Sequence, residues 1–278
     1  MASIITNNAS VTALQTLKTV QGNLTETQSR VSTGLKVQSA KDNAAYYSIA
    51  QTMRGDSAAF NSLSENLSIA GASVSVARQG TEELGKITKQ ILEKVSLAQA
   101  NESVDRTLIQ KDIASLVEQF HSTVAHTSYN GQSLLDGPGT VTVVTGITRE
   151  GGDFKTTNFT FEKFDHTDVS SLLDTLDVST PTHDAFSLRD LLTTVESNLA
   201  AITEAEANFG MVEKRIDNHK SFNSKLVDKF DAGVGSLVDA DMNKEAARLS
   251  ALQVQEQLAT QALSIANQAP QSILSLFR

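Results

Sequence analysis

The chain has 278 residues, a formal net charge of −9 and no cysteine. This length allows one sizeable core or two modest domains, and the missing cysteine excludes disulfides and thiolate chemistry. An acidic chain without a Lys/Arg cluster is not expected to bind nucleic acid, and an aromatic content of 5% favours long thin helices over a thick globular core.

The N-terminal segment carries no charged side chain from Met1 to Leu17. It has no basic region followed by an apolar one, so no signal peptide for Sec export is predicted. Apolar residues recur along it at heptad spacing, which is typical of a helix that packs against another helix. This stripe consists of Leu14, Leu17, Leu24, Val31 and Leu35. Ser39 to Asp42 then resembles the capping box of a helix start and predicts a break before the next helix.

The middle of the chain is dominated by helical periodicity. Apolar residues step by three and four from Phe60 to Ala98. Such persistence predicts one long helix with coiled-coil packing. A second stripe runs from Ile109 to Val124, and a third runs from Leu188 to Leu237.

Between the second and third stripes the sequence predicts a β-hairpin. Thr140–Thr148 (TVTVVTGIT) is β-branched, and Phe154–Phe161 (FKTTNFTF) is predicted as the returning strand. The intervening Arg149–Asp153 (REGGD) has the glycines of a tight turn. Thr167–Val178 follows as a short amphipathic segment.

The C-terminal segment resembles the N-terminal one, with no charged side chain from Gln257 to Phe277. Asp239 and Asp241 are predicted to begin its helix, because acidic groups suit a helix N-terminus. A heptad stripe then follows: Ala251, Gln255, Leu258, Ala262, Ile265 and Ala269. The amides of this segment make a bilayer span costly, so membrane insertion is not expected. We expect both terminal helices to be covered by copies of the chain or by a partner.

No residue pattern indicates catalysis or a metal. The five histidines have no ligand spacing. Asp239 imitates the start of a calcium loop, but Lys244 replaces its glycine and Ser250 its final glutamate. We predict no catalytic, cofactor-binding or metal-ligating residue and no cofactor, and hence no enzyme. An enzyme or a binding module stays a competing hypothesis, which would require a pocket with perturbed titratable groups.

Two stretches carry a family resemblance. Residues 29–54 (SRVSTGLKVQSAKDNAAYYSIAQTMR) resemble the N-terminal hallmark of bacterial flagellins. Residues 239–278 resemble their C-terminal hallmark, including Ala-Asn-Gln-Ala-Pro-Gln and the closing Ser-Leu-Phe-Arg. The resemblance extends through the central helices and covers nearly the whole chain.

The resemblance implies a mainly α fold, a long antiparallel coiled coil or bundle with a small β-hairpin, in which the N- and C-terminal helices pair. Residues 1–40 and 239–278 are expected to form the inner domain. Residues 41–135 and 184–238 are expected to form the rod domain. Residues 136–183 would hold the hairpin and connector, a reduced form of the family's variable outer region.

The leading hypothesis is that the chain is a structural subunit that assembles head-to-tail into the flagellar filament. A head-to-tail contact between subunits that does not close into a ring generates an open helical filament. Its terminal segments would be largely disordered in the monomer and fold together on assembly. The expected assembly interface comprises Leu14, Leu17, Leu24, Val31, Leu35, Leu258, Ala262, Ile265, Ala269, Ile273, Leu276 and Phe277. A hook–filament junction protein is the alternative with the same fold.

The resemblance also implies partners and a location. These are the flagellar export apparatus and a chaperone, the hook-associated and cap proteins, and a secreted, extracellular position reached by flagellar type III export. Many family members carry Leu-Gln-Arg-Val-Arg-Glu-Leu on the first long helix, which a host Toll-like receptor recognises. The matching Lys89–Gln99 has no arginine, so the corresponding face, with Gln90, Glu93 and Lys94, is expected to bind that receptor weakly.

Overall fold

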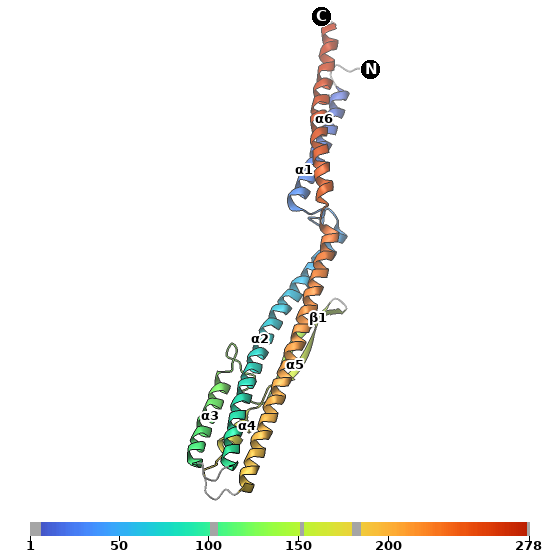
Figure 1. Cartoon of the computed structure of the whole chain (residues 1–278). Helices are drawn as coiled ribbons and strands as arrows, with labels where there is room; N and C mark the ends of the chain where they lie inside the picture. Colours follow the sequence, from blue (N-terminus) through green and yellow to red (C-terminus); the bar gives the residue numbers. More distant parts are fainter. Residues whose placement is uncertain (1–6, 101–104, 151–152, 180–184, 277–278) are drawn as a thin grey trace. The chain divides into compact units, whose positions relative to one another are not determined.

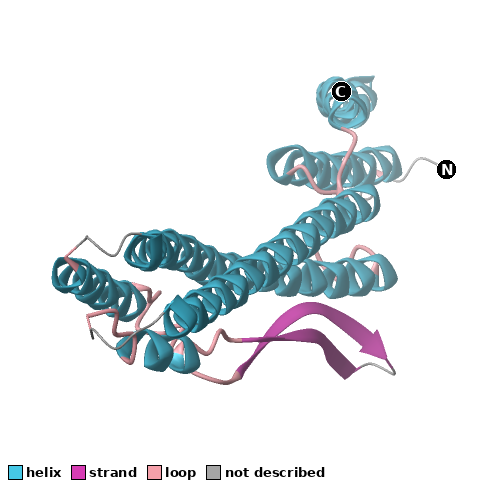
Figure 2. Cartoon of the chain, turned by 60° about the horizontal axis from the view of Figure 1, so that its bottom comes forward, coloured by secondary structure: helices cyan, strands magenta, loops and turns pink. Residues whose placement is uncertain are grey.

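The computed structural model describes residues 7–100, 105–150, 153–179 and 185–276 (Figure 1). These residues form α1 (Asn8–Thr33), α2 (Ala44–Ala100), α3 (Arg106–His126), β1 (Thr140–Glu150), β2 (Asp153–Glu162), α4 (Thr167–Asp174), α5 (Ala185–Val238) and α6 (Met242–Leu276). Helices dominate and the two strands form one antiparallel hairpin (Figure 2). The predicted mainly helical fold with paired terminal helices is confirmed.

The chain divides into two compact units. Unit 1 comprises Met1–Asp56 and Lys229–Arg278, and unit 2 comprises Ser57–Asp228. The five-segment division expected from the sequence stays a prediction.

Unit 2 is built on the apolar stripe of α2. From Phe60 to Ala98 this stripe is buried, apart from the half-buried Ala70, so the predicted long helix is confirmed. Helix α5 runs antiparallel to α2, because Arg78 of α2 pairs with Glu213 while Gly85, later in α2, lies opposite the earlier Ile202. Helix α3 contributes its own predicted stripe, including the fully buried Phe120.

Gly80 allows the end of α3 to approach α2 closely. A Cβ at this position would lie 2.7 Å from Thr127 Oγ1, closer than real atoms of this kind come. Thr127 cannot easily move away, because it is buried and its hydroxyl donates to the Thr123 carbonyl at 2.6 Å. The glycine is therefore required by packing and not by backbone conformation.

Gly80→Ala is expected to lower the free energy of unfolding of unit 2 by about 1–3 kcal/mol, the usual cost of overpacking. Gly85→Ala is the matched control, since its Cβ would make an ordinary 3.7 Å contact with Ile202 Cγ2. The control is expected to be neutral or to stabilise by up to about 1 kcal/mol through helix propensity. Urea titration followed by circular dichroism measures both, and equal effects would show that the close approach is relieved without cost.

The predicted hairpin is confirmed, with strands slightly longer than expected, and its tip at Gly151–Gly152 lies outside the described residues. Thr145 forms a bulge, because the register shifts between Val144 and Gly146. The Asn223 amide of α5 donates to the Thr145 carbonyl at 3.2 Å, and Arg215 lies 4.1 Å over the Phe159 ring. These contacts fix the hairpin to α5.

In unit 1, the predicted break between the first two helices is present, but α1 already ends at Thr33, before Leu35 and the predicted Ser39–Asp42. Gly34 adopts the left-handed conformation with φ 73° and its amide donates to the Arg30 carbonyl. The prediction that the capping box Ser39–Asp42 begins the next helix was wrong. Helix α2 begins at Ala44 and Asn43 caps it, its side chain accepting from the Tyr46 amide at 3.0 Å. The Asp42 carboxylate instead closes a turn by accepting from the amides of Ser39 and Gln38.

Two backbone amides hold the pKa of the Asp42 carboxyl below its ordinary value of 3.8, and the amide of Ser39 has a larger effect than the amide of Gln38. A lowered folded-state pKa means that this carboxylate contributes stability above 3.8, and that the contribution is lost as the pH falls through the folded-state pKa. An NMR titration of the Asp42 carboxyl carbon is expected to give a midpoint below 3.8. A midpoint at or above that value would mean that the turn is not formed in solution.

Candidate assembly interface

The candidate site is the pair of terminal helices, α1 and α6, which lie side by side in unit 1 (Figure 1). They run antiparallel, because early residues of α1 meet late residues of α6. Ser10 Oγ donates to Asn267 Oδ1 at 2.6 Å, and Gln21 Nε2 donates to Glu256 Oε1 at 3.3 Å. Asn7 also joins the two helices, since it caps α1 and donates to the Ala266 carbonyl at 2.7 Å. The register of the pair is thus set mainly by amides and hydroxyls.

The inward faces of the pair are apolar and buried only in part. Leu17 and Thr27 are buried on α1, while Leu252 and Ala259 are buried on α6. The spacing of seven residues between the last two is that of a helix seam. Because the hydrophobic stabilisation scales with the apolar area removed from water, these few buried residues stabilise the pair only modestly.

A charged contact joins α1 and α6 near the break that separates α1 from α2. Arg30 of α1 lies between Glu26, on its own helix, and Glu245 of α6, whose nearest oxygen is 3.5 Å away. Glu245 is buried and its Oε2 has no hydrogen-bond partner. A buried carboxylate is costly without a nearby cation, so Arg30 is the residue that allows Glu245 to lie there.

The outward face of α6 is also apolar, and within the described chain it is exposed. Val254, Leu258 and Ile265 have exposed fractions of 55%, 57% and 68%. The neighbouring Ala262 is exposed as well. Together these four residues define what we call the outer stripe. No charged residue follows Glu256 before the final Arg278, so this surface is weakly hydrated compared with the rest of an acidic chain.

The structure divides the predicted interface residues between two faces. Leu17 is buried and Leu24 and Val31 are half-buried, on the face of α1 that meets α6. Leu14 is exposed, and so are Leu258, Ala262 and Ile265. Leu35 packs beside a small cluster formed by Val37, Ala50, Val234 and Val238. Ala269, Ile273 and Leu276 belong to α6 without described side chains, and Phe277 lies outside the described residues.

Sequence reasoning missed the inward face of α6. Apolar residues occur on two faces of this helix, so two stripes compete. The predicted stripe shares Leu258, Ala262 and Ile265 with the outer stripe. The signal for the other was the spacing of Glu245, Leu252 and Ala259, which continues to Ala266. Arg30 was also missed, because nothing in the sequence pairs it with Glu245.

The three residues of the predicted receptor face lie on α2 in unit 2. Gln90 and Glu93 are exposed. Lys94 is engaged by α3, since its Nζ lies 2.6 Å from Asp112 Oδ2. This face therefore presents an amide, a carboxylate and a cation that is already paired.

Across the described parts of the chain, no three histidine, aspartate or glutamate side chains gather in a way that could hold a metal ion. The same residues contain no helix with the length and apolar character needed to cross a bilayer.

Comparisons with known proteins agree over most of the chain. Residues 4–140 match the bacterial flagellin N-terminal helical region, and residues 192–277 match the bacterial flagellin C-terminal helical region. The chain is 41% identical to a flagellin of Brucella melitensis, with 100% of both chains covered. It is 35% identical to flagellin C of Rhizobium meliloti, again with 100% of both covered. A crystal structure of Bacillus cereus flagellin matches 57% of this chain and 88% of its own, with 18% identity and a TM-score of 0.46.

Proposed function

Because this chain belongs to the bacterial flagellin family, we propose that the outer stripe of α6 contacts neighbouring subunits when the chain assembles. The chain is a structural subunit of the flagellar filament, an extracellular structure that serves motility. Relatives that match over their full length bear the name flagellin, so a hook–filament junction protein is not favoured.

One observation carries the proposal. An acidic chain places Val254, Leu258 and Ile265 on an exposed face that carries no charge beyond Glu256. Copies with a net charge of −9 repel one another, so their closest contacts are best made where charge is absent. When a neighbouring subunit covers one of these large side chains, its burial would stabilise the assembly by about 1.5–3 kcal/mol.

We also propose that the terminal helices fold fully only on assembly. The inward face of the pair buries few side chains, and apart from the Arg30–Glu245 ion pair its polar contacts are made by amides and hydroxyls that water can replace. Neighbouring subunits would supply the missing cover, so folding and assembly become coupled. Residues 1–40 and 239–278 would then form the inner domain, residues 41–135 and 184–238 the rod, and residues 136–183 the outer surface.

The remaining partners are proposals by family membership. The chain would leave the cell unfolded through the flagellar type III apparatus, guided by a chaperone. Hook-associated and cap proteins would meet it at the two ends of the filament. We propose no catalytic role and no cofactor, in keeping with a structural protein.

Seeded polymerisation tests the proposed function. Purified monomer is mixed with short filament fragments of the same protein and then sedimented. We expect the monomer to pellet with the seeds and the pellet to contain lengthened filaments by electron microscopy. Soluble protein at every concentration tested would contradict assembly.

Receptor recognition gives a separate prediction. A guanidinium offers several donors in a fixed plane, and lysine cannot reproduce this geometry. In this chain Lys94 is bound to Asp112, and Glu93 adds the opposite charge. Purified monomer is therefore expected to activate the host Toll-like receptor for flagellin weakly or not at all in reporter cells, while filaments form normally. Activation as potent as that by an arginine-bearing flagellin would show that another face of the chain is recognised.

A further inference from the structure

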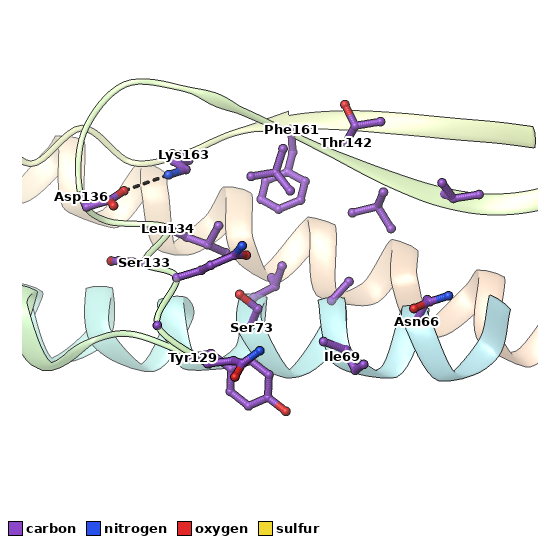
Figure 3. A pocket seen from close by; sticks show the side chains of 18 residues that line it. Asn66, Ile69, Ser73, Tyr129, Ser133, Leu134, Asp136, Thr142, Phe161 and Lys163 are labelled. Carbon is purple, nitrogen blue, oxygen red and sulfur yellow. Dashed lines mark hydrogen bonds and ion pairs between the residues drawn. The ribbon is translucent and has the colours of Figure 1, made fainter. Parts of the chain in front are cut away.

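The sequence contains a single Asn-Gly dipeptide, Asn130–Gly131. It forms the tip of a tight turn between Tyr129 and Gln132, and both residues of the dipeptide are exposed. The turn lines one end of a groove of about 600 Å³ in unit 2, whose other walls are α2 and the two strands (Figure 3). Water therefore reaches the dipeptide.

An asparagine followed by glycine can lose its side-chain amide without an enzyme. The backbone nitrogen of Gly131 attacks Asn130 Cγ, and the side-chain nitrogen leaves as ammonia with the proton of the Gly131 N–H, so that a succinimide ring closes. Water then adds to either ring carbonyl and gives aspartate or isoaspartate. The net reaction consumes water and releases ammonia, and it needs no other reactant. Glycine favours the attack because it has no Cβ to obstruct a close approach.

Both reacting groups are free of competing contacts. Among the described residues, none forms a hydrogen bond with the Asn130 side chain or with the backbone N–H of Gly131. A Cβ built on Gly131 would meet no atom within 4 Å, so the space beside this residue is open. The reaction is therefore not blocked by a neighbouring side chain.

The conformation of the closed turn nevertheless keeps the reacting atoms apart. Asn130 has a φ of 52° and Gly131 a φ of 76°, the positive pair that a type I′ turn requires. A non-glycine residue in this left-handed region has a ψ of about +30 to +60°. With tetrahedral geometry at Cα, such a ψ places the next nitrogen nearly opposite Cβ across the Cα–C bond, whereas ring closure requires both atoms on the same side.

Backbone hydrogen bonds hold the turn in this unreactive conformation. The Tyr129 amide donates to the Gln132 carbonyl at 2.8 Å, and the Gln132 amide donates to the Tyr129 carbonyl at 3.0 Å. Ser133 Oγ adds a bond of 2.9 Å to the Thr127 carbonyl beside the turn. The reactive conformation is reached only when the turn opens locally, and local opening costs free energy.

We propose that Asn130 is a deamidation site that the closed turn protects. It reacts in the unfolded chain and in the opened turn, and folding of unit 2 slows the reaction. The turn thereby spares the chain a modification that would add a negative charge and, in the isoaspartate product, lengthen the backbone at the tip of the turn. This inference concerns unit 2 alone and does not depend on the proposed assembly.

The full-length chain provides the first test. It is incubated in mildly alkaline buffer, once folded and once unfolded in guanidinium chloride, and the peptide that contains Asn130 is followed by mass spectrometry. Isoaspartate is detected by enzymatic methyl transfer to its carboxylate. We expect deamidation of Asn130 to be at least about tenfold slower in the folded chain, which corresponds to an opening free energy of at least about 1.4 kcal/mol.

A variant pair tests whether the turn is the protecting element. Gln132→Pro removes the amide that donates to the Tyr129 carbonyl and leaves the Asn-Gly dipeptide intact. Gln132→Ala is the matched control, because it keeps that amide. Deamidation in the folded Gln132→Pro chain is expected to approach the rate of the unfolded chain, whereas Gln132→Ala is expected to react as slowly as the unmodified chain. Circular dichroism checks that both variants keep their helical content.

Each possible result bears on the proposal. Equal rates at Asn130 in the folded and unfolded unmodified chain would overturn the protection, and this comparison needs no variant to fold. An unfolded chain that forms no isoaspartate at Asn130, or that deamidates Asn61 before Ser62 just as fast, would overturn the site. A folded Gln132→Pro chain that stays fully protected would show that the turn is not the gate.

Discussion

A chain that ends at Glu256 is expected to remain monomeric with seeds present, while its central helices stay folded. The deletion removes Leu258 and Ile265 from the outer stripe and Ala259 from the inward face. It leaves unit 2 untouched, since Ser57–Asp228 forms a compact unit. Loss of several apolar side chains from each contact, each worth about 1.5–3 kcal/mol, is expected to raise the critical concentration beyond measurement.

Sedimentation after seeding measures assembly of the shortened chain, and circular dichroism measures its helical content and thermal midpoint. The full-length chain, dissociated and seeded in the same way, is the control. Filaments formed by the shortened chain would show that assembly does not need this part of α6. A collapse of the thermal transition would show that unit 2 depends on the terminal helices.

Single substitutions on the outer stripe are expected to separate assembly from folding. Leu258→Asp or Ile265→Asp places a carboxylate where the monomer is open to water and the proposed filament is not. Burying an unpaired charge is costly, so each variant should fail to polymerise while its monomer melts within about one degree of the unmodified chain, as expected for an exposed site.

Leu252→Asp is the matched substitution on the inward face of the same helix, where the leucine is buried. It is expected to loosen the α1–α6 pair already in the monomer, seen as lost helical signal. Leu258→Met is expected to preserve assembly, because it keeps volume and apolar character. Strong destabilisation of the monomer by Leu258→Asp would place the outer stripe inside a core and contradict the assignment of faces.

The stripe of α2 was predictable from sequence because it has one apolar face. Steps of three and four from Phe60 to Ala98 leave one orientation that buries them, and the structure buries them. Helix α6 offered two apolar faces, so the sequence could not tell which would meet α1. That choice depends on long-range contacts such as Arg30 with Glu245.

Other features lay beyond sequence reasoning for the same reason. The cap of α2 falls on Asn43, since Asp42 is occupied by backbone amides of the preceding turn. The close approach at Gly80 exists because Thr127, many residues later, packs against it. The groove in unit 2 brings together a helix face, a turn and a strand edge that are separated in the sequence.

Electron cryomicroscopy of seeded filaments tests most directly whether neighbouring subunits cover the outer stripe. The map is expected to show α1 and α6 paired within each subunit, with Leu258 and Ile265 in contact with other subunits. Filaments in which these two side chains face water, or in which α6 pairs with α1 through the outer stripe, would contradict this account.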